Sequence, residues 1–191
     1  PLMQQHAGLG IAQGGWLAAF NYAGYFCGAL IAANISDLQK KDRLYRLGLL
    51  MALATTLGLA LTQNFWIWGA LRFFSGLSSA AGLLLGSGLV MHWLLRHQSR
   101  SELGIHFIGM GAGIFLTALF VYLIAEQISW QQHWYWFTAF GALLAIPAWF
   151  WLPRPNLSGY TVGGDKMMDQ PPSKQFLQSF MLAYFCAGVG Y

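Results

Sequence analysis

An arginine inside a long uncharged run is the residue of this sequence whose type and position most clearly suggest chemistry. Arg72 lies in the run Phe65–Leu95, which carries no other Asp, Glu, Lys or Arg. Charged side chains in such apolar segments usually face a cavity or a partner, because contact with hydrocarbon is costly. Arg72 could therefore bind an anionic group or bias the protonation of a nearby carboxylate. The alternative is a structural role, either paired with another helix or extended to the interface.

Three apolar runs carry small and polar residues at helical spacing, so each set is expected to lie on one helix face. The sets are Arg72, Ser75, Gly76, Ser79, Gly82 and Gly86; Asn21, Gly24, Tyr25, Gly28 and Ala32; and His106, Gly109, Gly113 and Thr117.

The polar members of these sets are candidates for a substrate or coupling pathway: Arg72, Ser75, Asn21, Tyr25 and His106. Asn21 and Tyr25 could line a cavity, or could form interhelical hydrogen bonds, which are worth about 0.6 kcal/mol on average. His106 could titrate near neutral pH or serve as a structural hydrogen-bonding residue. The glycines allow helix backbones to approach closely, so Gly24, Gly28, Gly76, Gly109 and Gly113, together with Asp37, are candidates for helix packing and gating.

The composition excludes most classes of soluble protein. Of 191 residues, 57% are hydrophobic and 8% are charged, whereas a soluble domain carries about 25% charged residues. Disorder requires low hydrophobicity and high charge. The two cysteines lie in apolar runs, which argues against a disulfide scaffold. The class that remains is a multi-pass membrane protein.

The apolar runs predict an all-α, polytopic transmembrane helix bundle. They do not alternate in polarity as barrel strands do, and lipid cannot satisfy an exposed backbone. The fragment is expected to hold five complete spans and the start of a sixth at Phe176: Trp16–Ile35, Leu47–Leu61, Phe65–Leu95, Leu103–Ala125 and Trp134–Leu152. Because the Leu47 run is short for a span, its helix is expected to start nearer Leu44.

The basic residues sort by connection. Nine of the ten Lys and Arg residues fall in Ser36–Arg46, Arg96–Glu102 and Pro153–Gln175, and the intervening connections have none. Positive connections stay cytoplasmic, so the basic balance indicates membrane orientation, and no nucleic-acid partner is expected. Tryptophans near the span ends are expected to anchor at the interface: Trp16, Trp66, Trp68, Trp93, Trp130, Trp134, Trp149 and Trp151.

The organisation suggests part of a larger protein. The chain opens on the outer side, so a further span is expected before Pro1, and its last apolar run is incomplete. We expect residues 1–152 to form an N-terminal transmembrane bundle lacking its first helix, 153–175 a cytoplasmic linker between bundles, and 176–191 the start of a C-terminal bundle. With the missing span counted, the Gly24 and Gly109 helices occupy equivalent places in two three-helix repeats, as in secondary transporters.

The sequence resembles the major facilitator superfamily and, within it, the YbfB/YjiJ-type family. The opening PLMQQ resembles the end of that family's first helix. The resemblance continues in GGWLAAFNYAGYFCGAL (14–30), ALRFFSGLSSA (70–80), LGIHFIGMGAGI (103–114), IPAWFWLPRP (146–155) and AYFCAGVGY (183–191). It implies a multi-pass carrier of the bacterial inner membrane that moves a small molecule by alternating access, with protons as the expected coupling ion. Its partners would be the lipid bilayer and the missing helices of the same transporter.

Two motifs carry the resemblance only in part. Arg72 and Gly76 match the fourth-helix motif, but its usual Gln is Ser75 here, which leaves proton coupling through it open. Asp37 stands where the family has its second-to-third-helix loop signature, without the expected glycines. Asp37 could cap a helix or pair with a basic residue at a cytoplasmic gate, and an ordinary positive connection explains the charges equally well.

Signatures of enzymes and cofactors are missing from the sequence. It has no phosphate-binding Gly-x-x-x-x-Gly-Lys, and its five histidines lack metal-ligand spacing. A rhomboid-type serine protease needs Gly-x-Ser-Gly, which fails at Ser75 because residue 73 is Phe. We expect no enzymatic activity, no cofactor and no metal. A non-transporting membrane scaffold or assembly subunit is the alternative function.

Overall fold

The computed structural model describes residues 7–100, 103–124 and 127–167, and five positions beyond them (Ser173, Gln175, Gln178, Ser179 and Leu182). Its elements are helical: α2 (Ile11–Ala33), α3 (Leu38–Leu61), α4 (Phe65–Ala80), η1 (Ala81–Leu85), α5 (Gly86–Arg96), α6 (Gly104–Ile124) and α7 (Trp130–Phe150). The described residues form no strand beyond an isolated bridge between Tyr160 and Lys166. The all-α fold class is confirmed. The expected sixth span lies outside the described residues except for Gln178, Ser179 and Leu182.

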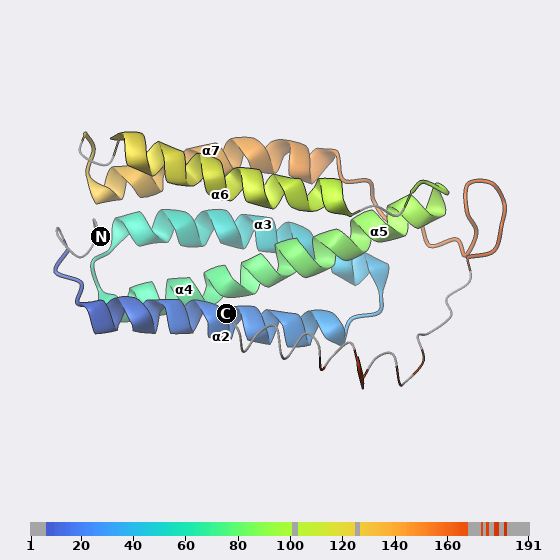
Figure 1. The fold of residues 1–191 in the computed structure, drawn as a ribbon, viewed down its shortest axis with the longest axis horizontal. Coiled ribbons are helices and arrows are strands. Elements are labelled where there is room, and N and C mark those ends of the chain that lie inside the picture. The colour runs from blue at the N-terminus through green and yellow to red at the C-terminus, as the bar shows by residue number, and fades with distance from the viewer. Residues whose placement is uncertain are drawn as a thin grey trace.

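The helices lie side by side as a bundle and alternate in direction (Figure 1). The connection 34–37, the segment after α5 and the segment after α7 all lie at the right-hand end of Figure 1, which we call the basic end. The connection 62–64 and the start of α7 lie at the other end, which we call the uncharged end. Segment η1 is a five-residue π-helix that joins α4 to α5, so Phe65–Arg96 is one rod of 32 residues.

Two helices begin earlier than predicted, because capping groups start them. α2 begins at Ile11 and α7 at Trp130. In each, a glutamine three residues into the helix accepts a hydrogen bond from the backbone N–H of the N-cap residue: Gln13 at 2.9 Å and Gln132 at 2.8 Å. This is half of a capping box, and it extends each helix beyond its most apolar part.

The start of α3 shows a larger difference. The apolar run begins at Leu47 and its helix is expected to start nearer Leu44, whereas α3 begins at Leu38, so most of the expected connection 36–46 is helical. The Asp37 carboxylate accepts from the backbone N–H of Gln39 at 2.8 Å. It thereby satisfies one of the donors that a helix N-terminus leaves without a partner. Asp37 therefore caps the helix, one of the two roles considered for it.

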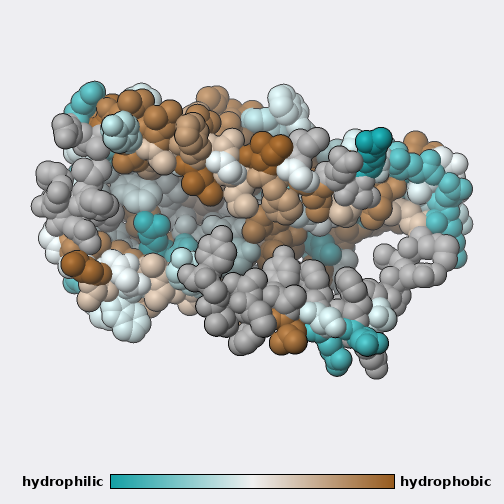
Figure 2. Space-filling view, viewed as in Figure 1, coloured by the Kyte–Doolittle hydropathy of each residue, from teal (hydrophilic) through white to brown (hydrophobic). Residues whose placement is uncertain are grey.

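Four helices of the described chain are long and apolar enough to cross a membrane: α2, α3, the α4–α5 rod and residues His106–Ile124 of α6. The predicted fifth span, α7, is a 21-residue helix but is not among them. Its first turn carries Gln131, Gln132 and His133. Large apolar side chains cover the outside of the bundle (Figure 2). In lipid, unlike water, such exposure has little cost. The protein is therefore a multi-pass membrane protein.

The largest buried side chains gather near the uncharged end. Leu17, Leu59, Trp68 and Trp130 form this core. Trp68 is 1% exposed and its indole N–H donates to the Leu59 carbonyl at 3.3 Å. The expectation of an interfacial anchor is therefore wrong for Trp68 and for Trp130, because both rings fill the space between helices.

The segment after α7 returns to the end of α5. The Arg96 guanidinium donates to the carbonyl oxygen of Ser158 at 2.9 Å, and the backbone N–H of Val162 donates to the Arg96 carbonyl at 2.9 Å. The described part of the predicted linker therefore packs on the bundle. The boundaries of the three predicted domains stay a prediction.

Candidate functional site

The closest contact between two helices lies around Arg72, where α2 meets α4. A Cβ atom at Gly24 would lie 1.9 Å from the carbonyl oxygen of Phe73, and one at Gly76 would lie 1.9 Å from the carbonyl oxygen of Asn21. Each glycine thus receives the backbone of the other helix, and no side chain fits at either position. Gly28 continues the contact one turn further, where a Cβ would lie 2.6 Å from the Cβ of Ala80 and 3.1 Å from the carbonyl oxygen of Leu77, both on α4.

Asn21 joins the two helices by a hydrogen bond. Its side-chain amide donates to the carbonyl oxygen of Arg72 at 3.1 Å. Of the two roles considered for Asn21, this contact is the interhelical one. Tyr25 lies half-buried on the same face, and its backbone nitrogen is 2.7 Å from the point where a Gly76 side chain would start. The two predicted faces therefore meet each other at Arg72.

The Arg72 guanidinium lies over the indole of Trp134 on α7, with its Cζ atom 5.3 Å from the ring centroid. Such a contact is worth about 0.5–2 kcal/mol, whereas arginine at the centre of a membrane helix costs about 2.5–3.5 kcal/mol on insertion scales. Among the described acidic residues, Asp37, Asp42 and Asp165, none forms an ion pair with Arg72. The ring alone therefore offsets only part of the cost of this charge.

Aromatic rings continue from Trp134 across α7 to α6. Trp134 packs edge-on against Phe137 at 6.0 Å, Phe137 lies 5.7 Å from Phe120, and Phe120 meets His133 at 6.3 Å. His133 is 4% exposed; its Nδ1 pairs with a backbone carbonyl, and its buried Nε2 has no hydrogen-bond partner. Figure 2 shows the face between α6 and α2 hollowed, with a floor that is mostly of intermediate hydropathy and in part hydrophilic.

Ser75 lies half-buried about one turn after Arg72, between Arg72 and the π-helix η1. Its carbonyl oxygen accepts from the hydroxyls of Ser78 at 2.7 Å and Ser79 at 2.9 Å. Serine hydroxyls bonded to the preceding turn compete with the helical ladder, and η1 follows directly. The residues of segment 81–85 are apolar or glycine, and their sequence contains no signal that would predict this π-helix.

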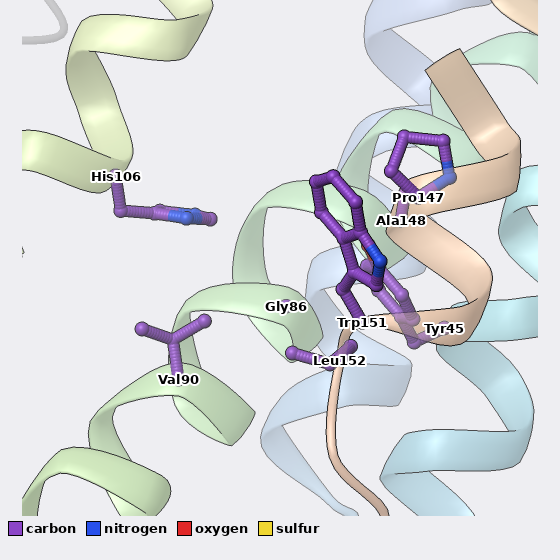
Figure 3. Close-up of a pocket in the computed structure, with 8 residues that line it drawn as sticks. All are labelled: Tyr45, Gly86, Val90, His106, Pro147, Ala148, Trp151 and Leu152. Carbon is purple, nitrogen blue, oxygen red and sulfur yellow. The ribbon is translucent and has the colours of Figure 1, made fainter. Parts of the chain in front are cut away.

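His106 belongs to a different place. It helps to line a cavity of about 330 Å³ at the basic end, into which its ring points from α6, opposite residues of α3, α5 and α7 (Figure 3). The lining residues are Tyr45, Gly86, Val90, His106, Pro147, Ala148, Trp151 and Leu152. Gly86, the last residue of the set expected to share a face with Arg72, is among them, but Arg72, Ser75 and Gly76 are not. Gly109 and Gly113, on the same helix, face open space within 4 Å, so the structure does not place them in a helix contact.

Arg46 is the polar residue that sequence reasoning missed. It is buried and pairs with Asp42 at 3.0 Å. Its guanidinium also donates to the carbonyl oxygens of Trp149 and, at 3.3 Å, Leu152, at the end of α7. Both residues had been assigned to a connection. Their i, i+4 spacing, which suits a helical ion pair, is the signal that could have found them.

The known proteins that this chain resembles are all described as transporters. A family model described as "Uncharacterised MFS-type transporter YbfB" matches residues 1–191. A cis,cis-muconate transport protein of Acinetobacter baylyi is 24% identical over 147 residues, which cover 77% of this chain and 35% of that protein. An MFS-type transporter of Yersinia enterocolitica is 25% identical over 134 residues, covering 68% and 35%. The MFS-type transporter phiD of a fungal species is 25% identical over 154 residues, covering 80% and 23%.

The chain spans about a third or less of the length of these relatives. No solved structure matches it.

Proposed function

This chain belongs to the YbfB-type family of major facilitator superfamily transporters, and from that premise we propose that the complete protein is a secondary carrier that moves a small solute by alternating access. Protons are the proposed coupling ion, and a bacterial inner membrane is the proposed location. The protein is a membrane transporter and not an enzyme.

The observation that carries the proposal is the match of a transporter family to the whole of residues 1–191. The geometry adds a charged group in a membrane-crossing rod, held where two helix backbones touch. In transporters of this kind, alternating access is largely a rocking of rigid bundles around a site near the midplane. A contact without intervening side chains, as at Gly24 and Gly76, suits helices that move as one body.

The candidate residues take different parts in this proposal. Arg72, with Ser75 and Tyr25 nearby, belongs to the solute pathway, and Asn21 holds the Arg72 backbone in place. His106 lies at the basic end, where a solute would pass between the pathway and the cytoplasm. Gly24, Gly28 and Gly76 keep α2 and α4 together, and Asp37 fixes the start of α3.

The test is counterflow in liposomes that contain the complete carrier. Radiolabelled cis,cis-muconate is the first solute to try, because one relative carries the name of its transport. We expect saturable counterflow that the Arg72→Ala variant loses while it still elutes as folded protein. Net uptake should follow an imposed pH gradient and stop when a protonophore collapses it.

Absence of counterflow for muconate and for a wide panel of metabolites, with stoichiometric recovery of a partner membrane protein, would instead support the scaffold. Flux that ignores the pH gradient would remove proton coupling and leave the carrier.

A further inference from the structure

The side chains around Arg72 indicate which kind of ligand this charge could bind. The guanidinium reaches from α4 to the face of Trp134, and the rings of Phe137 and Phe120 extend that aromatic surface toward α6. A cation beside a run of rings presents two kinds of surface at once. One is a fork of N–H donors, and the other is an apolar aromatic surface on which a flat group can stack against a single ring.

The donors of Arg72 stay available in the described part of the chain. Within residues 7–167, gaps excepted, Asp42 is held by Arg46, Asp37 caps α3, and the Asp165 carboxylate accepts from the Gln98 amide at 2.7 Å. A ring face attracts the cation but accepts no strong N–H hydrogen bonds. The planar guanidinium therefore keeps edges that match the two oxygens of a carboxylate.

The backbone of Arg72 is held by α2, and its guanidinium lies against Trp134, before any ligand arrives. Asn21 bonds to its carbonyl oxygen, and Gly24 and Gly76 leave no gap between the two backbones. A binding group that is already held in place loses less entropy when its ligand binds. The floor of the hollow between α6 and α2 is mostly pale in Figure 2, which marks residues of intermediate hydropathy, and part of it is teal and hydrophilic.

We propose that the transported solute is a small organic carboxylate with a flat, conjugated or aromatic skeleton. Its carboxylate pairs with the Arg72 guanidinium, and its skeleton lies along the rings of Trp134 and Phe137. This inference rests on the proposed function, because it assigns the substrate class of the same carrier.

Three solutes of nearly equal size separate the effect of the solute's charge on binding from the effect of its flat ring. They are tested on the unaltered complete carrier. Benzoate has both properties, benzamide lacks the charge, and cyclohexanecarboxylate lacks the flat ring. Binding is measured in nanodiscs by quenching of tryptophan fluorescence and, independently, by calorimetry. We expect benzoate to bind at least about tenfold more tightly than benzamide and at least about threefold more tightly than cyclohexanecarboxylate.

Variants then assign the effect to the residues. Arg72→Gln should weaken benzoate at least about tenfold and leave benzamide unchanged, whereas Arg72→Lys should fall between, since lysine keeps the charge and loses the fork. Trp134→Leu should remove the preference for benzoate over cyclohexanecarboxylate. Arg154→Gln is the matched control, because it removes an exposed arginine at the basic end and should leave all three affinities unchanged.

The outcomes separate this inference from the proposed function. Equal binding of benzoate and benzamide, or full benzoate affinity in folded Arg72→Gln, would overturn the carboxylate assignment. So would a carrier that shows counterflow of a sugar or an amine and ignores all three probes, and transport itself would then stand. Binding of benzoate with the expected order, but no counterflow of any solute, would support the site and remove the carrier. If Arg72→Gln fails to fold, the three-probe series on the unaltered protein still decides.

Discussion

Two arginines of this bundle make the same aromatic contact and differ in everything else. Arg46 on α3 and Arg72 on α4 each lie with Cζ 5.3 Å from the centroid of a tryptophan of α7, Trp149 for one and Trp134 for the other. Arg46 is also paired with Asp42 and donates to two backbone carbonyls. Arg72 has the ring without a described carboxylate. The tryptophan contact therefore does not distinguish a structural arginine from a binding one, whereas the use of the N–H donors does.

The difference follows from where each arginine meets α7. Arg46 lies near the last turn of α7, whose carbonyl oxygens have no N–H partners within the helix, and basic groups favour that end. Arg72 meets α7 near its first turn, where the backbone offers N–H groups that cannot accept from an arginine. The C-terminal end of α7 thus supplies carbonyl acceptors to the Arg46 guanidinium, whereas the N-terminal end supplies none to the Arg72 guanidinium.

The largest expected effect is on stability, in the Arg46→Met variant. Removal of one partner leaves the Asp42 carboxylate buried without compensation, which costs about 3–5 kcal/mol, and the carbonyls of Trp149 in α7 and of Leu152 just after it lose their donor. The measurement is unfolding of the complete carrier in mixed detergent–SDS micelles. Arg72→Met is the control, and we expect it to cost less than about 1 kcal/mol because no described carboxylate is left alone. Equal losses of unfolding free energy in Arg46→Met and Arg72→Met would contradict the distinction between a structural and a binding arginine.

A second substitution should reverse much of that loss. In Asp42→Asn/Arg46→Met the uncompensated charge is gone, and buried ion pairs can often be replaced at little net cost. We expect the double variant to be about 2 kcal/mol or more above Arg46→Met in the same unfolding assay. Strictly additive losses would mean that Asp42 and Arg46 contribute separately, and that the ion pair is not what holds Arg46.

The next effect concerns the backbone contact that holds Arg72. In Gly76→Ala the new methyl group meets the Asn21 carbonyl, so α2 and α4 must separate, and overpacking of this kind costs about 1–3 kcal/mol. Gly88→Ala on the same rod is the matched control. Nothing lies within 4 Å of it, and alanine is the better helix former there. We expect a lower unfolding midpoint for Gly76→Ala alone, and similar midpoints for both variants would contradict the close contact.

The sequence predicted the helices better than it predicted what joins them. Apolar runs located five helical segments, and the residues that shifted their starts, Asp37, Gln13 and Gln132, are local capping signals. The capping role of Asp37 was among the sequence expectations, whereas those of Gln13 and Gln132 were not. The α3 start was misplaced because its charges were assigned to a connection. A helix tolerates charges where they pair one turn apart and face a neighbouring helix end, as Arg46 does.

The candidate site shows the same division. The isolation of Arg72 among apolar residues was visible in the sequence, as were the glycines of α2 and α4. The partner ring, Trp134, was not, because it belongs to another helix and had been expected at the interface like the other tryptophans. Equal spacing on α6 gave no helix contact at Gly109 or Gly113. Glycine spacing shows that a close approach is allowed, and only the fold shows which face uses it.

The smallest expected effect shows how much the contact between α2 and α4 at Arg72 depends on one hydrogen bond. In Asn21→Ala the Arg72 carbonyl loses its side-chain donor but keeps the close contact at Gly24 and Gly76. Interhelical hydrogen bonds in membranes are worth about 0.6 kcal/mol on average, so we expect a loss of that order in the unfolding assay. Solute affinity should change by less than about threefold, because the backbone position is held mainly by the two glycines. A loss above about 2 kcal/mol would show that the hydrogen bond, rather than the glycine contact, keeps α4 in place.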